Sequence, residues 1–248
     1  MVVGAAPVLS PRWVVLGGLL AVFALYTAIA EHASDLSFRG DVALVALVLF
    51  PVVTGAVWLS LPLARSSAAV LIGATGICGV VAVGLGLLDA TALFDVAKIA
   101  TFALLGFWFL RFFEALWWLA LVALLVPLVD IWSVDRGPTH EVIVGRPSIF
   151  ENVSVTFQLP GETETANLGP PDILFFALFL AAAQRFELRV GLTWLAMTAF
   201  LSLTLVATAA WDVNGLPALP AICLGFLLPN VDVIWCSVRR ARSPVSGP

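Results

Sequence analysis

Eight long apolar runs dominate this sequence, and each is close to the length that a helix needs to cross a lipid bilayer. A membrane-spanning helix requires about 20 consecutive residues that are mostly apolar. Hydrophobic residues make up 61% of the chain and charged residues only 11%, whereas soluble domains have about 25% charged residues. We therefore expect an all-α, polytopic membrane helix bundle of about eight spans, with seven to nine possible. The runs are 13–30, 42–63, 67–88, 93–112, 114–134, 172–187, 190–210 and 217–238.

Composition also argues against several classes of ligand. The net charge of −4 provides no basic patch, so we expect no nucleic-acid partner. The three cysteines, Cys78, Cys223 and Cys236, are far apart within apolar runs and indicate no disulfide framework. His32 and His140 have no metal-ligand spacing around them. We therefore expect no zinc or di-metal site.

The runs divide the chain into three parts. Residues 1–113 hold the first four runs, residues 114–238 hold the last four with the loop 135–171, and residues 239–248 form a basic tail. The first run has an alternative interpretation as a signal peptide, because Ala28-Ile29-Ala30 resembles a cleavage site.

The placement of Lys and Arg predicts the orientation of the bundle. If the eight runs alternate in direction, eight of these residues lie on the side of the N-terminus and four on the other side. Cytoplasmic loops carry the excess of positive charge, so both termini are expected in the cytoplasm and loop 135–171 outside. The eight are Arg12, Arg65, Arg111, Arg185, Arg189, Arg239, Arg240 and Arg242, and the four are Arg39, Lys98, Arg136 and Arg146.

Loop 135–171 is the one long segment between runs. Two stretches rich in β-branched residues, 141–144 and 152–159, predict a short β-hairpin. The polar stretch "ETETAN" (162–167) is expected to be irregular. The hairpin is either a surface loop or an edge strand that pairs with an extended peptide.

Four acidic residues lie in or beside the apolar runs of the second half. Ionisable residues within a membrane are energetically costly and usually functional. Asp212 falls in the turn before the last run and is expected to be a solvated or helix-capping residue. Asp232 could pair with a polar group or line a cavity. Asp130 and Asp172 are the stronger candidates.

Asp130 and Asp172 are expected at the same depth. Asp130 precedes the end of its run by about four residues, or about 6 Å along a helix, and Asp172 begins the next, antiparallel run. The last run enters from the same side with Pro217 and Pro220. Two facing carboxyls in a low-dielectric site share a proton, which suits aspartyl-protease chemistry. A proton or ion pathway of a transporter and two unrelated helix-end carboxylates are the alternatives.

Three short motifs carry a resemblance to a known family. They are "VDIWSV" (129–134), "LGPPD" (168–172) and "LPALP" (216–220), in this order and at helix ends. The set resembles the presenilin and signal peptide peptidase family of GxGD intramembrane aspartyl proteases, of the prokaryotic presenilin-like kind. The resemblance covers about residues 114–238.

The resemblance implies a membrane-embedded endopeptidase without a cofactor. Its substrates would be transmembrane or signal-peptide-like helices within the bilayer, and the predicted outward loop implies a preference for type II segments, as in signal peptide peptidases. The implied catalytic residues are Asp130 and Asp172. The implied substrate-binding and site-shaping residues are Leu168, Gly169, Pro170, Pro171, Pro217, Ala218, Leu219 and Pro220.

Two positions depart from the family pattern. Val129 stands where the family usually has tyrosine, and Pro171 stands where it has the second glycine. Proline fixes the backbone angle φ and offers no N–H group to a substrate. A catalytically inactive presenilin-like protein that binds helices, and a small proton-coupled transporter, are therefore the alternative functions.

Overall fold

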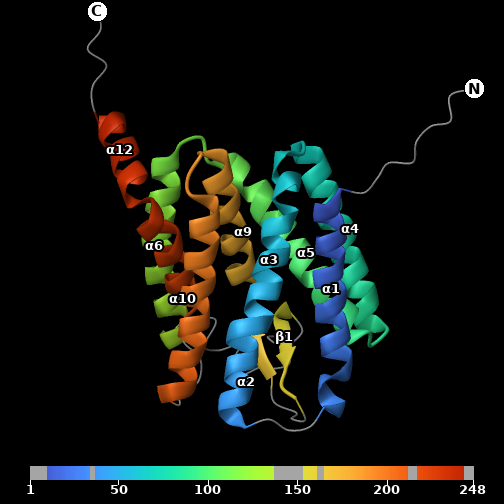
Figure 1. Cartoon of the computed structure of the whole chain (residues 1–248). Coiled ribbons are helices and arrows are strands. Elements are labelled where there is room, and N and C mark those ends of the chain that lie inside the picture. Colours follow the sequence, from blue (N-terminus) through green and yellow to red (C-terminus); the bar gives the residue numbers. More distant parts are fainter. Residues whose placement is uncertain (1–9, 34–36, 137–152, 161–164, 212–216, 243–248) are drawn as a thin grey trace, which may run out of the picture.

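The computed structural model describes residues 10–33, 37–136, 153–160, 165–211 and 217–242, which form a helical bundle with a small hairpin at one end (Figure 1). The α-helices of the N-terminal half are α1 (Pro11–Ile29), α2 (Phe38–Leu44), α3 (Phe50–Ser60), α4 (Ala68–Leu87) and α5 (Thr91–Phe109). Those of the C-terminal half are α6 (Leu116–Arg136), α9 (Pro170–Arg185), α10 (Val190–Trp211), α11 (Leu219–Leu227) and α12 (Val231–Arg242). Short helical turns, η1 (Ala30–His32), η3 (Leu61–Arg65), η4 (Leu110–Phe112) and η5 (Leu228–Asn230), extend several of them.

The bundle has two distinct ends. The first residue of α1 and the last residue of α12 lie at one end, which we call the terminal end and which is uppermost in Figure 1. The β-hairpin lies at the other end, which we call the hairpin end. Successive long helices alternate in direction between the two ends, as the apolar runs predicted.

Six helical segments among the described residues are long and apolar enough to cross a membrane. This is compatible with a multi-pass membrane protein. The six are Pro11–Ile29, Phe38–Arg65, Ala68–Leu87, Thr91–Phe112, Val190–Trp211 and Leu219–Arg239.

The other two predicted runs also form helices, but shorter apolar ones. The apolar part of α6 covers Leu116–Trp132, and α9 has 16 residues, fewer than the about 20 that a bilayer crossing needs. The helical-bundle prediction is confirmed, while the count of eight spans remains a prediction.

The segment Phe38–Arg65 changes its helical geometry in the middle. A π-helical turn, η2 (Val45–Leu49), joins α2 to α3 just before Pro51. Proline lacks the N–H group that an α-helix needs, so the regular ladder cannot continue unchanged through this position. Thr54, one turn later, is buried and donates to the carbonyl oxygen of Phe50 at 2.8 Å.

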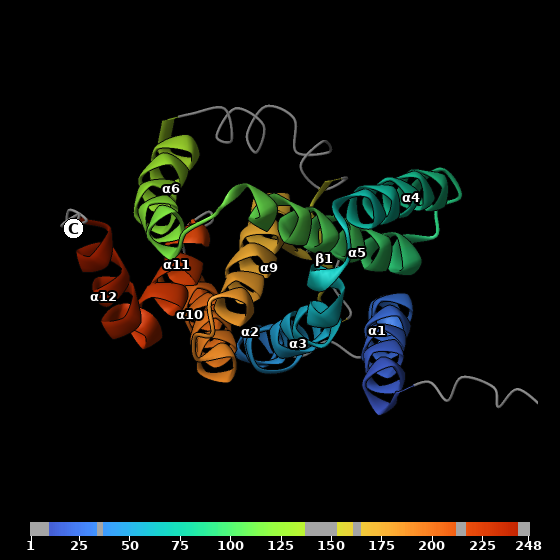
Figure 2. The ribbon, with the colours of Figure 1, turned by 90° about the horizontal axis from the view of Figure 1, so that it is seen from above.

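Helix α9 forms the centre of the bundle, with α5, α6, α10 and α11 around it (Figure 2). Its residues from Ala177 to Leu180 are completely buried. Gly106 permits the close approach of α5, because a Cβ atom there would lie 2.4 Å from the carbonyl oxygen of Leu174. A short helix that is apolar on all sides is stable here because protein surrounds it.

The hairpin joins β1 (Val155–Gln158) to β2 (Thr165–Leu168) in an antiparallel pair, with Val155 opposite Leu168. The predicted strand 152–159 contains β1, but the partner strand differs from the prediction. It comes from Thr165–Leu168, within and just after the polar stretch that we expected to be irregular. The other predicted strand, 141–144, lies outside the described residues. Pairing with β1 overrides the polar composition, because the hydrogen bonds of the ladder involve only the backbone.

Candidate functional site

Helices α6, α9 and α11 contact one another pairwise in the half of the bundle nearer the hairpin. Each contributes one of the three predicted motifs. The ring of Phe179 on α9 stacks on the ring of Phe226 on α11 with centroids 4.7 Å apart. On the other face of α11, Gly225 lies so close to α10 that a Cβ atom would be 2.4 Å from the Cα atom of Met197. These contacts hold the start of α11 in place beside α6 and α9.

Asp130 lies on the inward side of α6. Its neighbours Val129 and Ile131 are 62% and 49% exposed, whereas Asp130 is half-buried. Pro127 stands within the helix less than one turn earlier, where it removes one backbone hydrogen bond and favours a bend. Asp130 accepts a hydrogen bond through Oδ2 from the backbone N–H group of Leu219, at 3.3 Å.

The "PALP" motif forms the beginning of α11. Leu219 is the first helical residue, Ala218 is the N-cap and Pro220 stands in the first turn. The first N–H groups of a helix have no acceptor within the helix. Pro220 has no such group, and the N–H group of Leu219 is satisfied by Asp130. Pro220 therefore suits a helix start at which one N–H group, that of Leu219, binds a carboxylate.

The "LGPPD" motif connects β2 to α9. Leu168 is the buried last residue of β2, Gly169 is the N-cap of α9, and Pro170 and Pro171 occupy its first turn. Asp172 is half-buried and accepts a hydrogen bond through Oδ2 from the N–H group of Gly169, at 3.0 Å. The strand thus leads directly into the helix turn that presents Asp172.

The structure brings Asp130 and Asp172 within electrostatic reach of each other. Each has its Oδ2 atom bound by one backbone N–H group, and each Oδ1 atom has no hydrogen-bond partner among the described residues. Neither carboxyl forms an ion pair with a described cation. Two neighbouring carboxyls without a counter-ion disfavour the state in which both are ionised.

Side chains of the bundle bind backbone groups along the outer edge of β1. Lys98 donates to the carbonyl oxygen of Ser154, and the N–H group of Thr156 donates to Asp95 Oδ1 at 3.3 Å. The hydroxyl of Tyr26 donates to the carbonyl oxygen of Gln158 at 2.7 Å. No further strand can pair with this edge.

The outer edge of β2 has different surroundings. Thr156 and Asn167 are opposite each other, and the N–H group of Thr156 points away from β2 towards Asp95. In an antiparallel pair of this type, the backbone groups of Asn167 also point outward, away from β1. The side-chain Oδ1 atom of Asn167 is buried and has no hydrogen-bond partner among the described residues. This polar edge ends directly at Asp172.

The sequence analysis missed two buried acids in the N-terminal half. Asp95 and Lys98 form an ion pair at 2.7 Å and are 3% and 5% exposed. Their spacing of three residues inside an apolar run was the available signal, because such residues share a helix face. Lys98, which the orientation prediction counted on the side of loop 135–171, is buried within α5. Asp41 is 2% exposed, and its carboxyl oxygens lack a hydrogen-bond partner in the described part of the chain.

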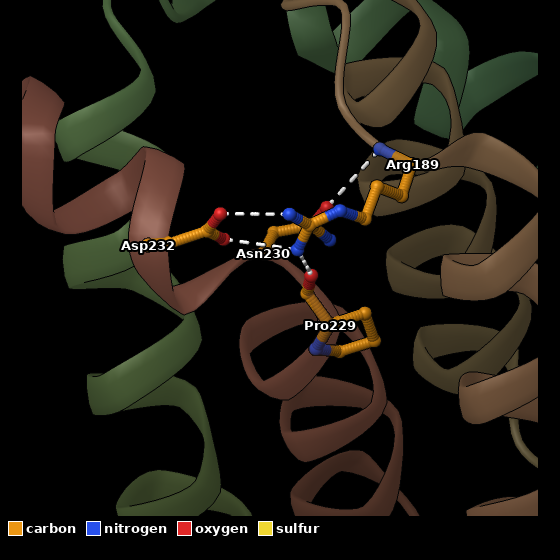
Figure 3. Close-up of polar contacts among 4 residues, drawn as sticks. All are labelled: Arg189, Pro229, Asn230 and Asp232. Carbon is orange, nitrogen blue, oxygen red and sulfur yellow. Dashed lines mark hydrogen bonds and ion pairs between the residues drawn. The ribbon is translucent and has the colours of Figure 1, made fainter.

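The remaining two acidic candidates lie apart from the pair. Asp232 forms a bidentate ion pair with Arg189, at 3.0 and 2.7 Å, near the terminal end (Figure 3). The neighbouring Asn230 accepts a hydrogen bond from the backbone N–H group of Arg189 at 3.2 Å. Asp232 thus links α12 to the start of α10. Asp212 lies outside the described residues.

No protein-family model, curated protein or solved structure matches this chain. The likeness to the presenilin and signal peptide peptidase family therefore rests on the motifs at 129–134, 168–172 and 216–220. No group of three or more metal-ligating side chains occurs in the ranges that the structure describes.

Proposed function

We propose that this protein is an intramembrane aspartyl protease that hydrolyses peptide bonds of transmembrane segments with Asp130 and Asp172. The observation that carries the proposal is that two carboxyls from different, contacting helices lie within electrostatic reach of each other, and that neither forms an ion pair with a described cation. Each keeps one oxygen atom without a described partner. The order and spacing of the three motifs support the same assignment.

The proposed reaction uses one proton shared by the two carboxyls. The ionised carboxylate removes a proton from a water molecule, whose oxygen adds to the carbonyl carbon of the substrate. The protonated carboxyl donates its proton to the carbonyl oxygen, which gives a tetrahedral diol. The diol collapses when the C–N bond breaks and a proton moves to the leaving amine. The N–H groups of Gly169 and Leu219 hold the two carboxyls in position throughout.

The outer edge of β2 is the proposed binding site for the substrate backbone. A peptide bond in a helix is shielded by its own turn, so a transmembrane substrate must unwind before hydrolysis. An extended segment that pairs with Asn167 is led towards Asp172, since β2 continues directly into α9. The closed outer edge of β1 leaves β2 as the strand available for this pairing.

The proposed topology has eight passes with both termini in the cytoplasm. Arg65, Arg111 and Arg185 are exposed and lie in or at the ends of η3, η4 and α9, and Arg189 precedes α10. Lys98, which was counted on the opposite side, is buried within α5. This orientation places loop 135–171 outside and favours substrates of type II orientation. Reporter fusions at residue 155 test it, and a cytoplasmic reporter signal contradicts it.

Asparagine substitutions test the proposed activity. Asp130→Asn and Asp172→Asn keep the size and one acceptor oxygen of each side chain but remove the ionisable group. Purified protein in lipid nanodiscs is incubated with a fluorescent transmembrane reporter of type II orientation. We expect each variant to lose cleavage, while Asp232→Asn, which alters an exposed acid far from the pair, cleaves at the wild-type rate.

A second candidate function is the binding of membrane helices without hydrolysis. Both carboxyls already serve as acceptors at helix starts, and Pro171 offers no N–H group, which together favour a structural role. A transition-state inhibitor of aspartyl proteases separates the two functions. Saturable binding of this inhibitor, lost in Asp172→Asn, supports the protease; binding of substrate helices without inhibitor binding supports the second candidate.

A further inference from the structure

A cavity of about 460 Å³ opens at the terminal end of the bundle, far from the two carboxyls and between η3, η4 and the last turn of α9. Its floor is apolar and includes Phe107 and Ala181. Its polar lining is Arg65, Arg111, Gln184, Arg185 and Glu187. Three arginines from three separate segments therefore line one cavity that opens to the surface.

The described residues do not neutralise the charge of this arginine cavity. Its lining contains three arginines and one glutamate, which give a net charge of +2. Glu187 forms no ion pair with any of these arginines in the described residues. Arg185 donates to the carbonyl oxygen of Leu110 at 3.1 Å, and Arg111 donates to that of Ser66. These neutral acceptors orient the guanidinium groups but leave their charge uncompensated.

Of the three arginines, Arg65 is the most available to a ligand. It is exposed and has no hydrogen-bond or ion-pair partner among the described residues. A guanidinium group offers five N–H donors in a planar arrangement that matches the oxygen atoms of a phosphate. The amide of Gln184 adds a neutral donor to the same lining.

The cavity stands at the level where membrane helices end. The candidate spans Phe38–Arg65 and Thr91–Phe112 both finish beside it. Arginines at this level meet the headgroups of the bilayer, and basic pockets between helices on the cytoplasmic side bind anionic lipids. Phe112, the residue after Arg111, is 59% exposed and offers an apolar surface for an acyl chain.

We propose that the arginine cavity binds the phosphate group of an anionic phospholipid. The three guanidinium groups bind the phosphate oxygens, and the apolar residues beside them contact the start of the acyl chains. The bound lipid neutralises the cavity and joins η3, η4 and α9 at the terminal end. The proposal is independent of the chemistry assigned to Asp130 and Asp172.

Native mass spectrometry of the purified full-length protein tests the proposal. The protein is titrated with phosphatidylglycerol or with phosphatidylcholine of the same chain length. We expect one phosphatidylglycerol molecule to bind in preference to phosphatidylcholine. Arg65→Gln is the informative variant, because Arg65 supports no described contact and its loss leaves the fold intact. We expect this variant to bind phosphatidylglycerol roughly tenfold more weakly, as for a lost charge-assisted hydrogen bond.

Two comparisons complete the experiment. Arg239→Gln is the matched control, because Arg239 lies on α12 towards the same end but does not line the cavity; it should bind the lipid as the wild type does. Inorganic phosphate is tested separately by thermal shift. If phosphate stabilises the wild type but not Arg65→Gln, and the wild type binds both lipids equally, the site binds free phosphate instead of a lipid headgroup. Equal lipid and phosphate binding by wild type and Arg65→Gln overturns the proposal.

Discussion

Asp95 in the N-terminal half and the pair Asp130 and Asp172 in the C-terminal half differ in how the charge of the carboxyl is compensated. Asp95 is paired with Lys98 at 2.7 Å and also accepts from the backbone of Thr156. Asp130 and Asp172 each accept a hydrogen bond from one backbone N–H group and lie within electrostatic reach of each other. Neither forms an ion pair with a described cation. Both sites touch the hairpin, since Asp95 binds β1 and Asp172 follows β2.

This difference indicates a structural role for Asp95 and Lys98, whereas Asp130 and Asp172 form the candidate functional site. A buried ion pair holds its neighbours in place, because removing either partner leaves an uncompensated charge. Two neighbouring carboxyls without a counter-ion disfavour the state in which both are ionised. Asp95 and Lys98 therefore bind the outer edge of β1 to α5. Asp130 and Asp172 each retain one carboxyl oxygen without a hydrogen-bond partner among the described residues.

The largest expected effect concerns the pair Asp130 and Asp172. If they act as one unit, Asp130→Asn and Asp172→Asn each lower the cleavage rate by about 10²–10⁴-fold, and the double variant is no slower than either single variant. Rates of reporter cleavage in nanodiscs measure this. If the cleavage rate of the double variant fell by the product of the two single-variant reductions, the two carboxyls would act separately.

The next largest effect is expected for the ion pair between Asp95 and Lys98. Asp95→Ala leaves Lys98 buried without a counter-ion, and we expect the free energy of unfolding to fall by about 3–5 kcal/mol. Thermal or denaturant-induced unfolding in detergent measures the loss. The double variant Asp95→Leu with Lys98→Met is the control, because it removes both charges and should recover most of the stability. A double variant as unstable as Asp95→Ala would contradict the role of the ion pair.

A smaller effect is expected where α5, which carries the ion pair, approaches α9, which carries Asp172. Gly106→Ala places a Cβ atom against the carbonyl oxygen of Leu174 and should destabilise the protein by about 1–3 kcal/mol. Gly84→Ala on α4 is the control, since it meets no atom within 4 Å. It should leave stability unchanged or raise it by up to about 1 kcal/mol. Equal effects of both alanines would exclude close packing at Gly106.

The smallest effect is expected for the outer edge of β2, compared with the edge that faces β1. Asn167→Pro removes an N–H group from the outer edge, and we expect roughly fivefold slower cleavage for the loss of about 1 kcal/mol of substrate pairing. The thermal unfolding temperature should change little. Ala166→Pro is the matched comparison, because its N–H group faces β1 and its loss disrupts the hairpin. Wild-type cleavage by Asn167→Pro would remove the strand-pairing step from the proposal.

The positions of the helices could be predicted closely from the sequence. The run 67–88 corresponds to α4 (Ala68–Leu87), and the run 190–210 corresponds to α10 (Val190–Trp211). The alternation of helices also predicted that Asp130, Asp172 and the "PALP" motif would approach the same depth. Run length and direction are local properties, so a single chain reveals them.

The pairing of the hairpin could not be predicted in the same way. The strand Thr165–Leu168 has a polar composition and only one buried residue, Leu168. Its conformation depends on pairing with β1, which itself depends on Tyr26, Asp95 and Lys98. The buried ion pair was overlooked for a related reason, because sequence alone does not show which face of α5 meets the hairpin.

The sequence by itself determined a bundle of apolar helices and the order of three motifs along it. Apolar side chains and internally hydrogen-bonded helices follow from local composition, whatever their neighbours. Only the tertiary structure decided which carboxyl has a cation, which strand edge the bundle binds and which arginines line a cavity. These properties depend on contacts between segments far apart in the chain, such as Lys98 with Ser154 and Asp130 with Leu219.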